Sequence, residues 1–351
     1  MKPLIIGDLI AKVPIIQGGM GVGVSRSSLA SAVASCGAIG VISGAQVGYD
    51  EDDFEINPLK ANLRALKKHI LKAKENSKGG IIGVNLMVAM NYYEEHVRTC
   101  IESGVDLIIS GAGLPTALPK LVKDSSVKIA PIVSTSKALS VILKMWDRKN
   151  NVTADMIVVE GPKAGGHLGY HNEELENIAS IDYDSEFLKI LDIAKNYGNK
   201  FNRHIPVIAA GGIFTGDDVK KYIDMGASGV QVGTKFVATH ECDASYNFKM
   251  TYINADEKDI KIVKSPVGMP GRAIENKFIK SVSNDKVKIT KCYNCLIPCN
   301  PSSTPYCISK ALIDAVRGDT QNGLLFCGSN AYKIDKLQSV SEVINELTSN
   351  L

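Results

Sequence analysis

The stretch PVIAAGGIFTGDD, residues 206–218, shows a pattern that recurs along the whole chain. A short, almost continuously apolar run at 206–210 is followed by two adjacent glycines, and a stretch with helical spacing follows at 217–225. Apolar runs of this kind are typical of strands that are buried on both faces of a parallel sheet. We therefore predict a strand, a glycine-rich turn and a helix, in that order.

The same unit occurs eight times, which is the number of strands in a (β/α)8 barrel. The other predicted strands begin near Pro14, Ala38, Ile81, Asp106, Lys128, Met156 and Gly229. Helical patterns lie between the strands at 27–35, 59–75, 92–103, 137–147, 185–197 and 217–225. An open, doubly wound sheet is the alternative. Glycines and polar residues follow the strands consistently, and QGGMGVG (17–23) lacks the GxGxxG spacing of a dinucleotide-binding sheet, so we predict an α/β fold with the barrel architecture.

The pattern breaks after about Thr251. We predict that residues 1–250 form the barrel, and that residues 251–351 form a substrate-covering segment and a C-terminal helical cap packed on it. The acidic loop 47–57 is expected to be solvated, as are His69 and His96 in their helical stretches. The long loop 163–183 follows the sixth strand, where barrel enzymes often carry lids.

The composition narrows the choice of partner and compartment. A net charge of +3 is too small to indicate nucleic acid or an anionic membrane as a partner. No apolar run reaches the ~20 residues of a membrane-spanning helix, and residues 1–14 lack the apolar core of a signal peptide. We expect a cytoplasmic protein that acts on a small molecule, and a homodimer stays open. In that compartment the eight cysteines are free thiols or metal ligands rather than a disulfide framework.

The seventh and eighth strands both end in glycine-rich turns. Backbone N–H groups at such turns can approach an anion closely, and a following helix N-terminus adds its dipole. The loops after these two strands form the recurrent phosphate site of barrel enzymes. We therefore predict a phosphate cradle made by Gly211, Gly212, Gly233 and Thr234.

His167 is the candidate catalytic residue. It follows the sixth strand in EGPKAGGHLGYH (160–171), within small residues that include Gly165 and Gly166. Small neighbours leave room for a flat ligand, and imidazole titrates near neutrality, which suits proton transfer.

Further polar or small residues end the remaining strands and would surround the same mouth of the barrel. The amides of Gln17 and Asn85 can donate to and accept from the edge of a heteroaromatic ring. The backbone at Gly18, Gly19 and Met20 could meet such a ring closely. The fourth and fifth strands contribute Gly111, Ala112 and Ser134.

These motifs, taken in order, resemble the nitronate monooxygenase (2-nitropropane dioxygenase) family. The similar segments are PIIQGGMG, GVN, SGAG, EGxxAGGHxG, IPVIAAGGI and VQVGTKF, and the resemblance covers roughly residues 1–280. The FMN-dependent enoyl-acyl-carrier-protein reductases of type II share nearly all of them. The resemblance implies that His167 is the catalytic histidine, and that GMPGRAIENKF (268–278) closes over the substrate. It also implies FMN contacts at Gln17, Gly18, Gly19, Met20, Asn85, Gly166, Gly211, Gly212, Gln231, Gly233 and Thr234.

Three redox activities fit this resemblance. The first is oxidation of alkyl nitronates by O2 to a carbonyl compound and nitrite, with His167 as the base. The second is reduction of enoyl thioesters and the third is reduction of quinones, and both would require NAD(P)H as a second cofactor. A phosphate-metabolite isomerase or aldolase is the alternative outside redox chemistry. It is disfavoured because no Schiff-base lysine or pair of carboxylates ends a strand, where Glu160 is the one acid to consider.

The cysteines of CYNCLIPC and Cys307 depart from the family pattern. Their spacing matches neither a paired-CxxC zinc site nor a regular ferredoxin run. We assign no metal ligand from the sequence, and metal binding and reduced thiols both stay open for Cys292, Cys295, Cys299 and Cys307.

Overall fold

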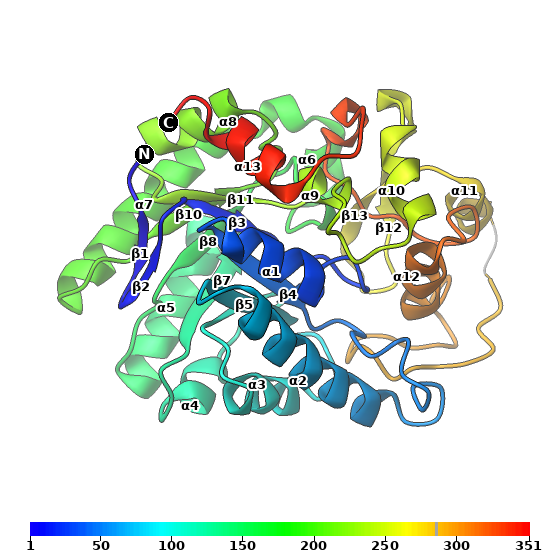
Figure 1. Ribbon diagram of the computed structural model, residues 1–351, viewed down its shortest axis with the longest axis horizontal. Helices are drawn as coiled ribbons and strands as arrows, with labels where there is room; N and C mark the ends of the chain where they lie inside the picture. The colour runs from blue at the N-terminus through cyan, green and yellow to red at the C-terminus, as the bar shows by residue number, and fades with distance from the viewer. Residues whose placement is uncertain (285–286) are drawn as a thin grey trace.

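Eight parallel strands close into a barrel, as predicted (Figure 1). The structure is a computed structural model that describes residues 1–284 and 287–351, so Asp285 and Lys286, within the predicted covering segment, lie outside the described residues. The barrel strands, in their order around the ring, are β3 (Ile15–Gln17), β4 (Ile39–Ser43), β5 (Ile81–Met87), β6 (Leu107–Gly111), β7 (Lys128–Val133), β8 (Ile157–Glu160), β10 (Val207–Ala210) and β11 (Gly229–Val232).

Helices surround the barrel, each predicted stretch matching one of them. They are α1 (Ser27–Ser35), α2 (Pro58–Asn76), α3 (Tyr93–Glu102), α5 (Ser136–Asn150), α7 (Tyr183–Lys200) and α8 (Gly216–Asp224), with the short α4 (Leu118–Val122) in addition. The helices begin where the sequence offers caps: the side chain of Asn57 accepts the N–H of Lys60, and Pro58 takes the first turn of α2. Thr135 caps α5 in the same way.

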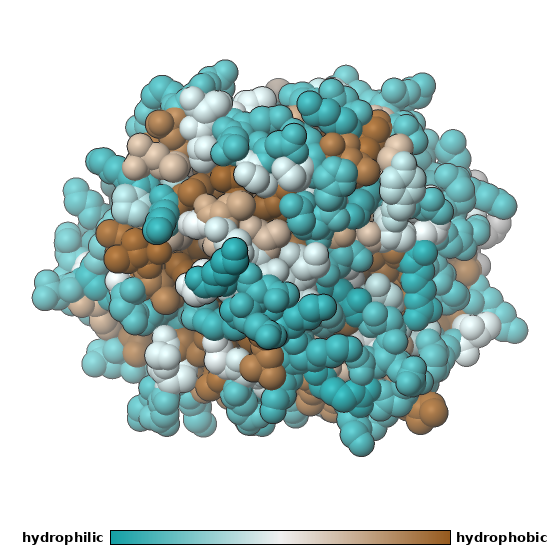
Figure 2. Space-filling view, viewed as in Figure 1, coloured by the Kyte–Doolittle hydropathy of each residue, from teal (hydrophilic) through white to brown (hydrophobic). Residues whose placement is uncertain are grey.

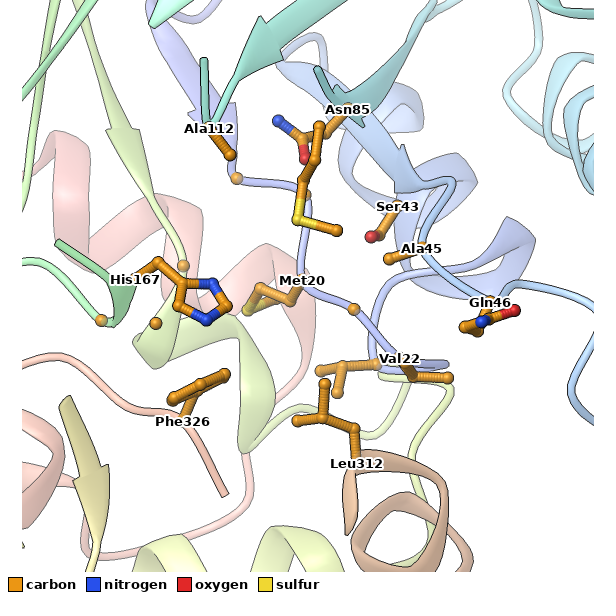
Figure 3. A pocket seen from close by; sticks show the side chains of 18 of the residues that line it. Met20, Val22, Ser43, Ala45, Gln46, Asn85, Ala112, His167, Leu312 and Phe326 are labelled. Carbon is orange, nitrogen blue, oxygen red and sulfur yellow. The ribbon is translucent and has the colours of Figure 1, made fainter. Parts of the chain in front are cut away.

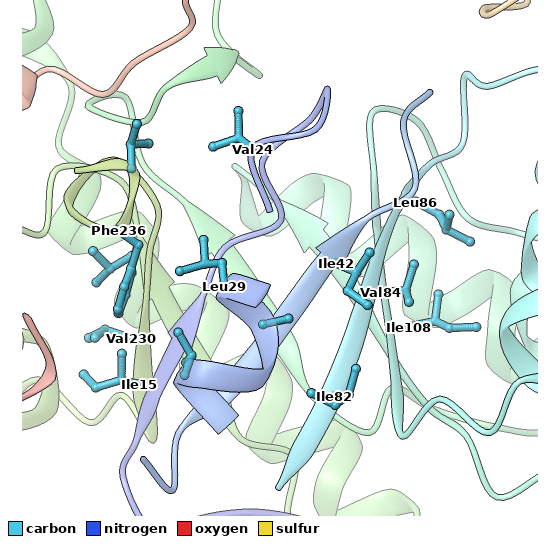
Figure 4. Packing of buried hydrophobic residues seen from close by; sticks show 14 of the residues in the cluster. Ile15, Val24, Leu29, Ile42, Ile82, Val84, Leu86, Ile108, Val230 and Phe236 are labelled. Atoms are coloured by element: carbon cyan, nitrogen blue, oxygen red, sulfur yellow. The ribbon is translucent and has the colours of Figure 1, made fainter. Parts of the chain in front are cut away.

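The core has two layers, because successive residues of a strand point to opposite sides of the barrel wall. One layer fills the barrel interior, with Ile16, Val41, Leu107, Val158 and Ile208 fully buried. The larger layer packs between the strands and the helices. Figure 4 shows this second layer where Leu29 of α1 meets Ile15 and Val230.

The hairpin of β1 (Leu4–Ile6) and β2 (Leu9–Ala11) closes the N-terminal end of the barrel, because Leu4, Ile6 and Ala11 join the interior layer. Figure 1 shows most of the remaining elements at the opposite end, where the site predicted from the sequence lies. They are β9 (Gly166–His167), α9 (Thr234–Val237), α10 (Tyr246–Ile253), β12 (Ile260–Lys264), β13 (Pro270–Ile274), α11 (Lys277–Asn284) and α12 (Ile308–Arg317). The chain also has α6 (Asn172–Glu176) and 3-10 turns at Ile178–Ser180, Glu257–Asp259 and Ala331–Lys333.

The last helix, α13 (Val340–Thr348), packs against α8 and α1. It therefore takes the place that follows β11 in the ring of barrel helices, although it belongs to the last hundred residues. The division into a barrel of 1–250 and a covering segment of 251–351 stays a proposal.

Figure 2 shows mainly hydrophilic residues on one face of the molecule, with hydrophobic residues between them. Among the described residues, no helix is long and apolar enough to cross a membrane.

Candidate active site

A cavity of about 500 Å³ opens at the C-terminal ends of the barrel strands (Figure 3). The inward-facing residue at the end of several strands lines it, as strand alternation requires. Ser43 of β4, Asn85 of β5, Gly111 of β6, Glu160 of β8 and Gln231 of β11 reach the cavity in this way.

The structure brings nearly all of the predicted site residues to this one cavity. Those that line it are Gly18, Gly19, Met20, Asn85, Gly111, Ala112, Gly165, Gly166, His167, Gly211, Gly212, Gln231, Gly233 and Thr234.

Gln17 and Ser134 are not on the cavity wall. The Gln17 side chain is fully buried within the barrel wall, where its amide donates to the carbonyl of Gly18 and accepts the N–H of Val41 at 3.0 Å. This amide joins β3 to β4, which share a single pair of residues, Ile16 and Ile39. Ser134 lies against Gly169, where an added Cβ would come within 2.5 Å of the serine hydroxyl oxygen.

One end of the cavity, which we call the phosphate end, is built from backbone. The N–H groups of Gly212, Ile213 and Gly233 have no acceptor within the part of the chain that the structure describes. Unpaired backbone donors grouped in this way suit the oxygens of a phosphate. The start of α8 is not available to a ligand in this way, because the carboxylate of Asp218, inside α8, already accepts the N–H groups of Phe214 and Thr215 at 2.9 Å. The short helix α9 begins at Thr234, on the cavity wall itself.

A segment far along the chain closes the phosphate end. The N–H of Gly328 donates to the hydroxyl of Thr234 at 2.9 Å, and the amide of Asn330 donates to the carbonyl of Gly212 at 2.6 Å. Gly165 permits this approach, since a Cβ there would lie 2.5 Å from the carbonyl carbon of Cys327. The sequence pattern did not predict Gly328 or Asn330 as site residues. The glycine and polar residues of CGSN (327–330) were the one feature of the sequence that could have indicated them.

His167 lies on the cavity wall in β9, which pairs with β13 through Gly271. Its Nε2 is 2.6 Å from the hydroxyl of Ser265, and its ring meets the ring of Phe326 edge-on at 5.0 Å between centroids. Figure 3 shows the imidazole facing Met20 across the cavity. Burial lowers the pKa of His167 to about 4, so the imidazole is neutral at pH 7.

Glu160 is the acidic residue at the end of β8. Burial raises the pKa of its carboxyl to about 7, although the charge of Arg272 opposes this shift. Arg272 is itself buried, and it donates to the carbonyl oxygens of Ala164 and Pro162, which hold the His167 loop in place. A carboxyl that titrates near neutrality on the wall can exchange a proton with a ligand.

The other end of the cavity, which we call the outer end, is built from side chains. It is formed by Asn57–Leu59, Asn91–Tyr92, His96 and Cys292–Leu296. The last of these segments belongs to residues 291–299, which we call the strap. The strap lies on the loop after β5, where the N–H of Asn91 donates to the carbonyl of Cys295 at 3.1 Å and the N–H of Ile297 to that of Ala89 at 2.9 Å.

Two expectations of solvated residues were wrong at this end. His96 is 2% exposed, and its Nδ1 lies 2.8 Å from the carbonyl of Tyr92 while its Nε2 has no partner among the described residues. The acidic loop is also partly buried, because Phe54 is 1% exposed and stacks on Tyr293 of the strap. Phe54 is covered by the strap, a part of the chain that is distant in sequence, and local polarity cannot reveal such a contact.

Barrel, cavity and buried imidazole together define a (β/α)8-barrel enzyme. The model of the nitronate monooxygenase family matches residues 2–350, and the chain belongs to this family of flavin-dependent oxidoreductases. A relative named "Probable nitronate monooxygenase" from Staphylococcus saprophyticus is 27% identical over 302 residues, which are 80% of either chain.

Two solved structures share the fold. FabK from Thermotoga maritima is 24% identical with a TM-score of 0.71, and the match covers 97% of this chain and 93% of FabK. The nitroalkane oxidase from Streptomyces ansochromogenes is 19% identical with a TM-score of 0.73, and the match covers 97% of this chain and 95% of that one. At these identities the likeness shows the fold alone.

Proposed function

We propose that the protein is an FMN-dependent nitronate monooxygenase that oxidises small alkyl nitronates with O2 to a carbonyl compound and nitrite. Membership of the family supports the activity. The observation that carries the proposal is the neutral imidazole of His167 on the wall of a cavity that has unpaired backbone donors at one end.

The cavity wall suits FMN in two respects besides the phosphate end. The side-chain Oε1 of Gln231, on the cavity wall, is buried without a partner in the described part of the chain. The same is true of the hydroxyl of Ser329, which stands between the wall residues Gly328 and Asn330. Groups of this kind are costly unless a ligand satisfies them. Gly212, Ile213, Gly233 and Ser329 would hold the phosphate, while Gln231 and Asn85 would face the ring. When bound, FMN supplies the electron-accepting chemistry of the reaction.

His167 would manage the proton of the substrate. In the tautomer that donates Nε2–H to Ser265, Nδ1 keeps its lone pair and can take the α-proton of a neutral nitroalkane. The low pKa keeps this nitrogen unprotonated at pH 7. Ser265 would hold the ring in place, and Phe326 would exclude water from one side of it.

Reduction of enoyl thioesters by NAD(P)H is the second candidate function. The cavity continues from His167 to the strap at Cys292 and Cys295, which is more room than a small nitronate needs. An extended substrate would use this outer end.

One anaerobic experiment separates the two functions. The FMN-loaded protein is mixed with a small alkyl nitronate or with NADH or NADPH, and the flavin absorbance is followed. We expect nitronate to bleach the flavin and the pyridine nucleotides to leave it oxidised, with nitrite appearing when O2 is admitted. Rapid bleaching by NADH or NADPH, with none by nitronate, would overturn the monooxygenase proposal in favour of a reductase.

A further inference from the structure

Four cysteines gather at the outer end of the cavity. Cys292, Cys295 and Cys299 lie on the strap, and Cys307 is the residue immediately before α12. All four are free thiols, and three of them are partly buried. Nothing in the proposed reaction uses them.

The strap brings its cysteines to the start of α12, where Cys307 stands. Cys295 and Cys299 pack against the apolar group that contains Ile308, the residue after Cys307. Cys292 and Cys295 line the cavity together with Ile308 and Ser309 of the same helix. The four cysteines therefore belong to one region of the structure, although they are spread over sixteen positions of the chain.

A hydrogen-bond donor points at one of the sulfur atoms. The N–H of Asn294 donates to the sulfur of Cys292 at 3.4 Å. Ser309 and Lys310 stand in the first turn of α12, shortly after Cys307. Donors of this kind stabilise thiolates and are typical of the sulfurs around iron–sulfur clusters.

The spacing of the four sulfur atoms distinguishes between two kinds of metal site. The sulfurs of a four-cysteine zinc site lie within about 4 Å of one another, because all bind a single ion. Among the described residues, no group of three His, Cys, Asp or Glu side chains could hold one metal ion. In a [4Fe–4S] cluster each cysteine binds a different iron, so the sulfurs stand farther apart.

We propose that Cys292, Cys295, Cys299 and Cys307 hold a [4Fe–4S] cluster at the outer end of the cavity. Leu296, Tyr306 and Ile308 form an apolar group against Cys295 and Cys299, which suits a buried cluster. The buried hydroxyl of Thr304, between Cys299 and Cys307 in the chain, has no partner among the described residues and is a further donor for its sulfurs.

The position of the cluster has a redox consequence. Cys292 and Cys295 line the same cavity as His167, so the cluster stands beside the chamber proposed for the flavin. A [4Fe–4S] cluster takes up one electron, whereas FMN takes up two electrons with two protons. Full reduction by dithionite should therefore consume about three electron equivalents per chain instead of about two.

The test uses the full chain, prepared without oxygen and reconstituted with ferrous iron and sulfide under reducing conditions. Iron, zinc and acid-labile sulfide are assayed per chain. Cys295→Ser and Cys299→Ser remove ligands, and Cys36→Ser is the matched control, because Cys36 is partly buried but lies outside the cluster. Bound flavin and thermal unfolding are measured in every variant, so that loss of folding is separated from loss of iron.

We expect about four irons and four sulfides per chain, with an electron paramagnetic resonance signal after reduction. The two ligand variants should lose most of the iron and keep the flavin, and Cys36→Ser should keep both. Iron-free protein after reconstitution, or one zinc per chain without sulfide, would overturn the proposal. The iron assay does not depend on flavin, so failure of the FMN proposal would be visible separately.

Discussion

The two ends of the cavity are built in different ways. The phosphate end uses backbone N–H groups at the ends of β10 and β11, which the barrel itself fixes. The outer end uses side chains from the loops after β4 and β5 and from the strap. A backbone cradle depends on little more than glycine at a few positions, whereas a surface of side chains can change without disturbing the barrel. The difference fits our proposal that the phosphate end holds the cofactor, and it leads us to propose that the outer end selects the substrate.

His167 lies on the wall of the cavity to which both ends belong, and its replacement should have the largest effect. His167→Ala removes the proposed base, so turnover of a neutral nitroalkane should fall ~10²–10⁴-fold. FMN content should not change, because the imidazole is not a part of the phosphate end. Steady-state kinetics and flavin absorbance measure the two quantities. Ser265→Ala is the control, and we expect a smaller loss from it, since it only orients the ring. Unchanged turnover in His167→Ala would refute the role.

The pH profile of the wild-type enzyme tests the same residue without a substitution. The pKa of His167 is lowered to about 4, so the base form persists as the pH falls through the ordinary value of 6.5. The acid limb of kcat/KM for a neutral nitroalkane should therefore lie near pH 4, because this parameter reports the free enzyme. A limb near pH 7 that disappears in Glu160→Gln would instead assign the essential proton to Glu160.

Two glycine substitutions separate folding from ligand binding at the phosphate end. A Cβ on Gly233 would have the Met20 sulfur at 3.5 Å as its nearest neighbour, so Gly233→Ala should fold normally. It should nevertheless weaken FMN binding ~10–100-fold, because the methyl group enters the space proposed for the phosphate. Gly165→Ala should lower the melting temperature as well, since its Cβ would collide with the backbone of Cys327 and Gly328. Equal FMN affinity in Gly233→Ala and wild type would place the phosphate elsewhere.

Substitutions at Gln231 and at Gln17 should affect the stability of the apoprotein in different directions. The buried Oε1 of Gln231 lacks a partner among the described residues, whereas both ends of the Gln17 amide are bonded. Gln231→Leu should leave the apoprotein as stable or make it ~1–3 kcal/mol more stable, and should weaken FMN binding about tenfold. Gln17→Leu should destabilise the apoprotein. Chemical denaturation and flavin titration measure both effects. A loss of apoprotein stability in Gln231→Leu would show that the protein, and not the flavin, satisfies that amide.

The sequence predicted the phosphate end better than the outer end, for a physical reason. Strands and their terminal glycines follow from short-range patterns, so the sequence alone was enough to place Gly211, Gly212 and Gly233 at the cavity. Gly328 and Asn330 come from a turn about a hundred residues later, and only packing brings them to the site. Gln17 shows a further limit, because an amide at a strand end can bond to its own barrel wall as well as to a ligand.

His96 marks the corresponding limit at the outer end. Its spacing to Tyr93, Val97 and Cys100, all buried, places it on the inner face of α3. Helical periodicity could therefore have predicted its burial, whereas residue type favoured exposure. The contact of the strap with the loop after β5 joins residues that are about two hundred positions apart, and no local pattern predicts it.

The smallest predicted effect comes from breaking the contacts of Glu55 with the strap. Lys291 forms an ion pair with Glu55, and the Tyr293 hydroxyl donates to the same carboxylate at 3.2 Å. Because this pair is exposed, it should contribute no more than about 1 kcal/mol. Glu55→Gln should therefore raise the KM of a long-chain nitroalkane about two- to threefold and leave that of nitroethane unchanged. Arg98→Ala is the matched control, since it removes an exposed ion pair with Glu94 within α3, away from the strap. Equal effects on long and short substrates would mean that the outer end does not contact the substrate chain, and the contrast between the two ends would then be one of construction alone.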